Sequence, residues 1–117
     1  MHDDPVLTNP ELYHVEMENE RVRVLEYRDR PGDKTTPHDH PDSVMVTLSA
    51  FRRRLSDGTN STDMAFEPGL TRWLAAQRHV GENIGDSETH VIFVELEEPK
   101  PASREPAAPP PLGPTEV

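Results

Sequence analysis

The sequence contains no cysteine and few aromatic residues, with one Trp, two Tyr and three Phe among its 117 residues. Without cysteine, the chain can form no disulfide framework, no thiolate metal site and no cysteine nucleophile. Any metal site must therefore be built from nitrogen and oxygen ligands.

Long apolar runs are also missing, and none approaches the length needed to span a bilayer. The first ten residues, MHDDPVLTNP, lack the basic and apolar regions of a signal peptide. We therefore expect no membrane association and a cytoplasmic location.

Basic residues are scarce: twelve Lys and Arg stand against 22 Asp and Glu, which gives a formal net charge of −10. This balance disfavours binding to nucleic acid or to an anionic membrane. The one basic run, Arg52-Arg53-Arg54, is interpreted as a solvated strand edge, because Arg is seldom buried.

Proline is unevenly distributed, with seven of the thirteen prolines in residues 99–117. This stretch has no apolar periodicity and is predicted to be a flexible, disordered Pro-rich C-terminal tail. The prediction for the chain is a flexible N-terminus at 1–10, one folded domain at 11–98 and the tail at 99–117.

Within the domain, short runs rich in β-branched and aromatic residues alternate with turn residues about every ten positions, which predicts an all-β sandwich or barrel. Trp73, Tyr27, Phe66 and Phe93 are expected in the core, with one or two at the mouth of a cavity. The expected strands are Leu12–Met17, Arg21–Arg28, Pro37–His40, Val44–Leu48, Phe51–Leu55, Asp63–Phe66, Thr71–Leu74, His79–Ile84 and His90–Leu96.

The last of these strands is apolar on both faces: Ile92, Val94 and Leu96 share one face, and Val91 and Phe93 share the other. One face can fill a barrel, and the other would then meet a second sheet or a partner chain. We therefore expect a homodimer.

The residue pair His38 and His40 follows a Pro-Gly turn, and side chains two apart on a strand point to the same side. Both imidazoles can then reach one ion, and a third ligand would leave coordination positions open. His79 is the best candidate for the third ligand because it begins an expected interior strand. His90 is second, His14 is third, and His2 lies in the predicted flexible terminus.

These residues resemble two motifs of the cupin superfamily. Gly32, His38 and His40 match the first motif, and Gly69, His79 and Asn83 match the second, across residues 20–97. The resemblance is closest to short single-domain cupins, some of which are linked to β-alanine degradation. It implies a cupin-type double-stranded β-helix (jelly-roll) barrel with one divalent metal ion inside, held by His38, His40 and His79.

The sequence departs from the motifs at several positions. Val44 or Met45 stands where the first motif has a Glu ligand, and strand parity predicts that Val44 points inward. Asp42 is an alternative ligand, although its position after Pro41 favours a turn.

The resemblance implies Fe(II) as the first expectation for the ion, with Mn, Ni, Co or Zn as alternatives. Cupins with three histidines include oxygenases that bind an anionic substrate on iron, so a dioxygenase acting on a small anionic metabolite is the leading hypothesis. A non-enzymatic binding or sensing module is the second, and a degenerate interaction scaffold is the third. No residue pair specifies a catalytic acid or base.

Overall fold

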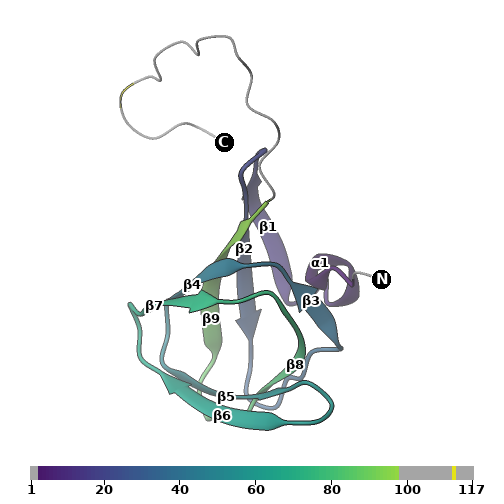
Figure 1. Ribbon diagram of the computed structural model, residues 1–117. Coiled ribbons are helices and arrows are strands. Elements are labelled where there is room, and N and C mark those ends of the chain that lie inside the picture. Colours follow the sequence, from purple (N-terminus) through teal and green to yellow (C-terminus); the bar gives the residue numbers. More distant parts are fainter. Residues whose placement is uncertain (1–2, 98–111, 113–117) are drawn as a thin grey trace.

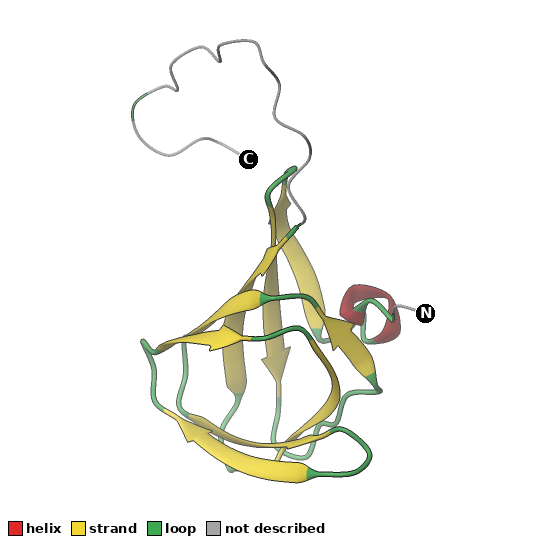
Figure 2. Cartoon of the chain, viewed as in Figure 1, coloured by secondary structure: helices red, strands yellow, loops and turns green. Residues whose placement is uncertain are grey.

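The computed structural model describes residues 3–97 and Leu112, and the described part is almost entirely β-structure (Figures 1 and 2). Each of the nine expected strands is present, with ends shifted by no more than two residues. The elements are α1 (Pro5–Thr8), β1 (Tyr13–Glu18), β2 (Val22–Asp29), β3 (His38–His40), β4 (Ser43–Thr47), β5 (Phe51–Ser56), β6 (Ser61–Phe66), β7 (Thr71–Leu74), β8 (Gln77–Asn83) and β9 (Thr89–Leu96).

The strands form two sheets that face each other across the core of a barrel (Figure 1). One sheet has the order β1-β2-β9-β4-β7 and the other has the order β3-β8-β5-β6. All neighbouring strands are antiparallel. The all-β barrel expected from the sequence is therefore confirmed.

The core lies between the sheets and is filled by alternate residues of each strand, as the period of two in a β-strand requires. In the five-stranded sheet, Leu25 lies opposite Phe93, which lies opposite Met45. Leu25 is fully buried, and Tyr13, Tyr27, Phe51, Val91 and Phe93 complete the buried apolar cluster.

Part of the outer face of the same sheet is also apolar, although Glu26 lies beside Ile92 on it. Val24 lies opposite Val94, which lies opposite Val44, and the neighbouring row contains Ile92 and Val46. The prediction that β9 is apolar on both faces therefore holds for most of the strand. The inner face of β9 ends in a carboxylate, because the side chain of Glu95 points to the same side as that of Phe93 and is only 2 % exposed.

The N-terminal segment packs on the barrel from Asp3 onward, so the packed part of the chain begins before the predicted boundary at residue 11. Asp4 caps α1 by accepting a hydrogen bond from the amide of Val6, and Pro5 is buried. Asn9 is buried and accepts a hydrogen bond from the amide of Thr36. A single turn of helix has no apolar periodicity, which is why the sequence pattern did not indicate it.

The Pro-rich stretch predicted to be a tail, 99–117, lies outside the described residues except for Leu112. Among the described residues, α1 is the only helix, and with four residues it is far too short to cross a membrane.

Candidate metal centre

Three buried histidines come together between the two sheets. His38 and His40 lie on β3 with their side chains inward, and His79 lies on the neighbouring strand β8 directly opposite His38. Their exposed fractions are 1, 3 and 8 %, respectively. The alternation of β3 and its pairing with β8 thus bring together the three residues that the motifs singled out.

The ring nitrogens of this cluster have the spacing of metal ligands. One ligand atom from each of the three histidines lies within 4.8 Å of the others, and the Nε2 atoms of His38 and His40 are 3.0 Å apart. Two nitrogens that bind one ion at about 2.1 Å and at a right angle would be separated by about 3.0 Å. The His38–His40 pair therefore fits an octahedral or similarly open coordination shell.

The other ring nitrogen of each histidine faces an acceptor. Nδ1 of His38 is 2.8 Å from the carbonyl oxygen of Thr36, and Nδ1 of His79 is 2.7 Å from Oε1 of Gln77. Nδ1 of His40 is 3.7 Å from Oε2 of Glu95. Each acceptor favours a proton on Nδ1, which leaves the Nε2 lone pair free to bind a cation.

Glu95 is fixed in place by a chain of ion pairs. Its Oε1 accepts a hydrogen bond from Nε of Arg23 at 2.8 Å and forms an ion pair with Nη2 at 2.7 Å. Nη1 of Arg23 lies 2.8 Å from Asp4. Among the described residues, Oε2 of Glu95 and Nδ1 of His40 are the only buried side-chain polar atoms without a hydrogen-bond partner. They face each other, so a small movement of His40 would satisfy both.

Convergent Nε2 lone pairs repel each other at 3.0 Å unless a cation or a proton lies between them. The hydroxyl of Tyr13 is 3.3 Å from Nε2 of His38 and 3.4 Å from Nε2 of His40, so it can donate to only one of them at a time. A divalent ion would satisfy all three imidazoles together. The donor set therefore fits such an ion.

Burial keeps two of these histidines neutral. Burial, with a smaller contribution from the neighbouring His40, lowers the pKa of His38 to about 4 and that of His79 to about 3. Burial also raises the pKa of the Tyr13 hydroxyl well above its usual value of 10. At neutral pH, His38 and His79 are thus in the form that binds metal.

The two remaining histidines among the described residues, His14 and His90, lie outside this cluster. Nε2 of His90, the second candidate for the third ligand, donates a hydrogen bond at 2.7 Å to the carboxylate of Glu26 on the outer face of the sheet. His14 is exposed on β1, and His2 lies outside the described residues.

The alternative ligand Asp42 occupies a turn, as its Pro-Asp context favoured, and accepts a hydrogen bond from the amide of Ala76. The expectation that Val44 points inward is wrong: Val44 lies on the outer face beside Val94, and Met45 lines the cavity instead. The chain crosses from one sheet to the other at Pro41 and Asp42. The inward positions of β4 therefore cannot be found by counting every second residue from His38 and His40.

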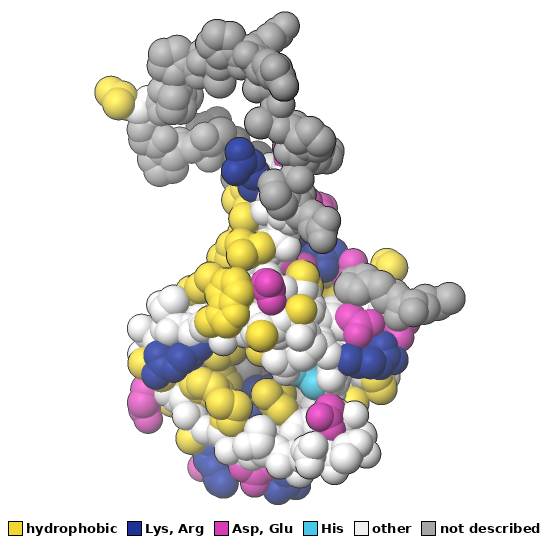
Figure 3. Space-filling model, viewed as in Figure 1, with side chains coloured by type: hydrophobic (Ala, Val, Ile, Leu, Met, Phe, Trp, Pro, Cys, Tyr) yellow, Lys and Arg dark blue, Asp and Glu magenta, His cyan; other side chains and the backbone are white. Residues whose placement is uncertain are grey.

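A cavity of about 200 Å³ opens beside the histidines, and His38 and His79 form part of its wall. Most of the wall is apolar, and Figure 3 shows hydrophobic side chains around the hollow with a histidine at its edge. Trp73 is 58 % exposed and lines this cavity, so it does not lie in the core and is one of the aromatic residues expected at the cavity mouth. It lies on the edge strand β7, where only one neighbouring strand covers it.

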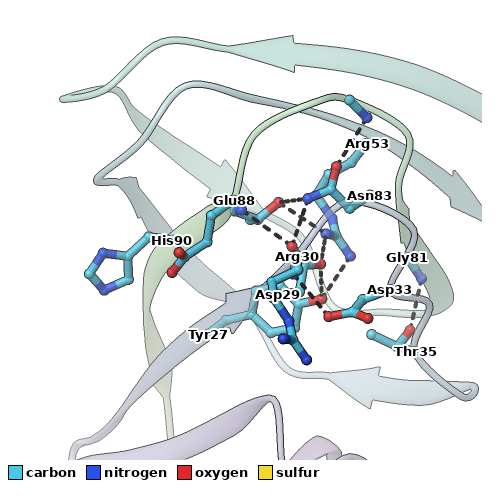
Figure 4. A network of polar contacts seen from close by, with 12 residues as sticks. Tyr27, Asp29, Arg30, Asp33, Thr35, Arg53, Gly81, Asn83, Glu88 and His90 are labelled. Atoms are coloured by element: carbon cyan, nitrogen blue, oxygen red, sulfur yellow. Dashed lines mark hydrogen bonds and ion pairs between the residues drawn. The ribbon is translucent and has the colours of Figure 1, made fainter.

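The interpretation of Arg52-Arg53-Arg54 as a solvated edge is wrong for the middle residue. Arg53 points into the barrel and lines the cavity, and its side chain is 11 % exposed. Its charge is balanced by Asp29, which is buried and receives hydrogen bonds from Tyr27 and from the motif residue Asn83 (Figure 4). Asn83 therefore holds this polar network together and is not part of the histidine cluster.

Three residues around the site were not predicted from the sequence: Glu95, Tyr13 and Arg53. Two of them are charged and alternate with core residues: Glu95 follows Phe93 by two positions, and Arg53 lies between Phe51 and Leu55. A charged residue in phase with an inward-facing row was the available signal. The many apolar residues of β9 and the run of three consecutive arginines obscure this signal.

Comparison of the sequence with models of protein families and with curated proteins gives no match. Solved structures do match. A cupin domain from Bordetella pertussis Tohama I is 27 % identical, with a TM-score of 0.69 over 74 % of this chain and 93 % of that chain. An RmlC-like cupin with a double-stranded β-helix fold from Methanocaldococcus jannaschii is 10 % identical, with a TM-score of 0.59 over 74 % and 79 %.

A cupin 2 conserved barrel domain protein from Salinispora arenicola is 17 % identical, with a TM-score of 0.56 over 78 % of this chain and 79 % of that chain. The last two likenesses concern the fold alone. The chain has the cupin double-stranded β-helix fold, and the resemblance that the two motifs indicated is confirmed. Its cluster of three buried histidines is compatible with metal binding.

Proposed function

We propose that this chain is a mononuclear metal-binding cupin in which His38, His40 and His79 hold one divalent ion. The observation that carries the proposal is the joint arrangement of the three imidazoles. Their Nε2 atoms converge, while each Nδ1 faces a carbonyl, amide or carboxylate oxygen. Such outer partners are typical of histidines that bind metal.

The charge of this site favours an anionic ligand. Neither Val44 nor Met45 has a side-chain donor suited to a divalent ion, so the three neutral imidazoles would leave the charge of the ion uncompensated within its own shell. The carboxylate of Glu95 faces His40 from the side away from the cluster. A small anion entering through the cavity would supply negative charge on the open side.

We further propose that the chain is an Fe(II)-dependent oxygenase acting on a small anionic metabolite. Iron bound by the three histidines would supply oxygen activation and an open position for the substrate. The chain's own contribution is to hold the imidazoles neutral by burial, to orient them through Nδ1, and to limit water through the apolar cavity wall. Mn, Ni, Co and Zn suit the same imidazole donors and are the alternatives to iron.

A second function, non-enzymatic binding or sensing of a small molecule, is favoured by the composition of the cavity wall. The described residues that line it include no Asp or Glu that could act as a general acid or base.

The two proposals are separated by measuring the metal content of protein purified without chelator, and then oxygen uptake with Fe(II) and a panel of carboxylates and diketones. Stoichiometric metal with substrate-dependent oxygen uptake supports the oxygenase. Metal with tight ligand binding but no oxygen uptake supports the binding module.

A further inference from the structure

The hydroxyl of Tyr13 lies where the imidazole nitrogens of the histidine cluster converge. Tyr13 begins β1 in the five-stranded sheet, opposite the sheet that carries the histidines, and is 4 % exposed. Its oxygen is 3.3 Å from Nε2 of His38 and 3.4 Å from Nε2 of His40. Among the described residues, these two nitrogens are the only hydrogen-bond partners of the hydroxyl. The two sheets thus bring a fourth oxygen or nitrogen donor to the cluster.

The oxygen and the two nitrogens have the spacing of three neighbouring ligands around one ion. The sides of the triangle that they form are 3.0, 3.3 and 3.4 Å long. Ligand atoms about 2.1 Å from an ion are separated by about 3.0 Å at octahedral angles and by about 3.4 Å at tetrahedral angles. All three sides fall within this range, so the Tyr13 oxygen fits the same coordination shell as the imidazoles.

Metal binding would remove both hydrogen-bond acceptors of this hydroxyl. Each Nε2 has a single lone pair, which cannot accept the proton of Tyr13 once it binds an ion. A buried O–H group without an acceptor is costly. When the cluster holds an ion, the hydroxyl must therefore bind the ion itself, or a water or ligand in the cavity that Tyr13 lines.

The charge of the site favours a direct bond to the ion. Three neutral imidazoles bring no negative charge, and neither Val44 nor Met45 can replace the carboxylate of the first motif. Burial raises the pKa of Tyr13 and keeps the hydroxyl protonated in metal-free protein. A bound cation reverses this preference, as it does for a coordinating thiol. The resulting phenolate would offset one of the two charges of the ion, and a small anion can balance the other.

We propose that Tyr13 is a fourth ligand of the ion and binds it through the phenolate oxygen, beside the three histidines. The inference rests on the proposed function and adds a protein ligand to that site. On binding, the O–H bond of Tyr13 breaks, a bond between oxygen and metal forms, and the proton is released to water. Strands β1, β3 and β8 would then supply three nitrogens and one oxygen.

Ultraviolet difference spectroscopy during a titration with Zn(II) tests this proposal. Zn(II) does not absorb in this range, and the chain has only two tyrosines. The wild type at neutral pH should develop the difference band of a tyrosinate, and the band should saturate at one Zn(II) per chain. Tyr13→Phe should show no such band. Tyr27→Phe is the matched control and should keep the band, because the Tyr27 hydroxyl donates to Asp29 instead.

Two further measurements support the assignment. Fe(III)-loaded wild type and Tyr27→Phe should show the visible charge-transfer band of an iron–phenolate pair, whereas Tyr13→Phe should lack it. Competition with a chelating indicator should show that Tyr13→Phe binds Zn(II) about tenfold or more weakly, since even the loss of an outer partner of a metal ligand acts on this scale. If Tyr13→Phe does not fold, Tyr27→Phe still assigns the bands, because Tyr13 is then the only tyrosine left.

Metal content is measured by mass spectrometry on every sample, so that the two proposals fail separately. A wild type that binds no Zn(II) would contradict the proposed function, and the inference would fall with it. A wild type that binds one Zn(II) without a tyrosinate band would overturn the inference alone. The same holds for a band that persists in Tyr13→Phe, or for a Tyr13→Phe variant that binds Zn(II) as tightly as the wild type.

Discussion

Glu95 is the residue through which the barrel can adjust the basicity of one candidate ligand. Arg23 holds one of its oxygens, and the other faces Nδ1 of His40 at 3.7 Å. A carboxylate in this position favours the tautomer whose Nε2 lone pair points to the ion. Glu95 thus supplies a negative charge close to a site that lacks the carboxylate ligand of the first motif.

Replacement of Glu95 by Gln should weaken metal binding by about 10- to 100-fold. The Gln oxygen can still accept from Arg23, but its amide group would then donate to Nδ1 of His40 and favour a proton on Nε2. Competition with a chelating indicator measures the affinity. Glu88→Gln, an exposed carboxylate beside Arg28, is the control, and equal affinities for the two variants would exclude the role of Glu95.

The low pKa values of His38 and His79 predict how the stability of metal-free protein depends on pH. Both values, about 4 and about 3, lie below the ordinary 6.5 that applies in the unfolded chain. Between pH 6.5 and about 3 the unfolded chain therefore binds more protons, so the free energy of unfolding falls as pH decreases through this window. Above pH 6.5 these two groups should contribute no pH dependence.

Urea denaturation of chelator-treated protein between pH 7.5 and 5 measures this effect, in a range where most carboxylates stay ionised. A His38→Asn/His79→Asn double variant should show a smaller loss of stability over the same range. An identical slope for the double variant and the wild type would mean that other groups cause the dependence.

At the scale of elements, α1 is small but tied to the site. Asp4 caps the helix and pairs with Arg23, which holds Glu95. Asp4→Ala removes the cap and the ion pair and should reduce the free energy of unfolding by about 1–2 kcal/mol. Asp4→Asn keeps a good cap and should cost less, so urea denaturation of the two variants separates the contributions. Equal stability of Asp4→Ala and the wild type would contradict this role of α1.

The strands were predictable because period-two alternation and turn residues mark them locally. The turns at Gly32 and Gly69, where φ is +89° and +82°, are marked by Pro-Gly pairs. The inward direction of the Met45 side chain was not predictable in the same way, because the alternation of inward and outward residues does not continue through the crossover between sheets at Pro41 and Asp42. Local patterns define strands, whereas the side chains that meet across the barrel depend on sheet order.

The same limit applies to the site. His38 and His40 share a strand, and His79 could be added by its motif spacing. Glu95 and Tyr13 come from β9 and β1 of the opposite sheet, and no sequence spacing relates them to β3. Arg53 could have been found from its alternation with Phe51 and Leu55.

At the scale of the whole molecule, the apolar part of the outer face of the five-stranded sheet leads us to propose the homodimer that the sequence predicts. Val24, Val44 and Val94 form one row across three strands, and Ile92 and Val46 extend it. Burial of such a face against a second copy is typical of homodimer interfaces. Static light scattering at micromolar concentration should return twice the mass of the chain.

Val94→Lys should place a charge at the centre of this face and yield monomers, whereas Glu16→Lys on the exposed part of β1 should not. A wild-type mass equal to that of one chain would remove the dimer proposal without affecting the site inside the barrel.

The central claim is that His38, His40 and His79 bind one divalent ion together, and metal content by mass spectrometry tests it most directly. Wild-type protein loaded with Fe(II) under anaerobic conditions and then desalted should retain about one ion per chain. Alanine at any one of the three positions should remove most of it, whereas His90→Ala and His14→Ala should retain it. A wild type that retains no metal, or a His79→Ala variant that retains all of it, would contradict the account.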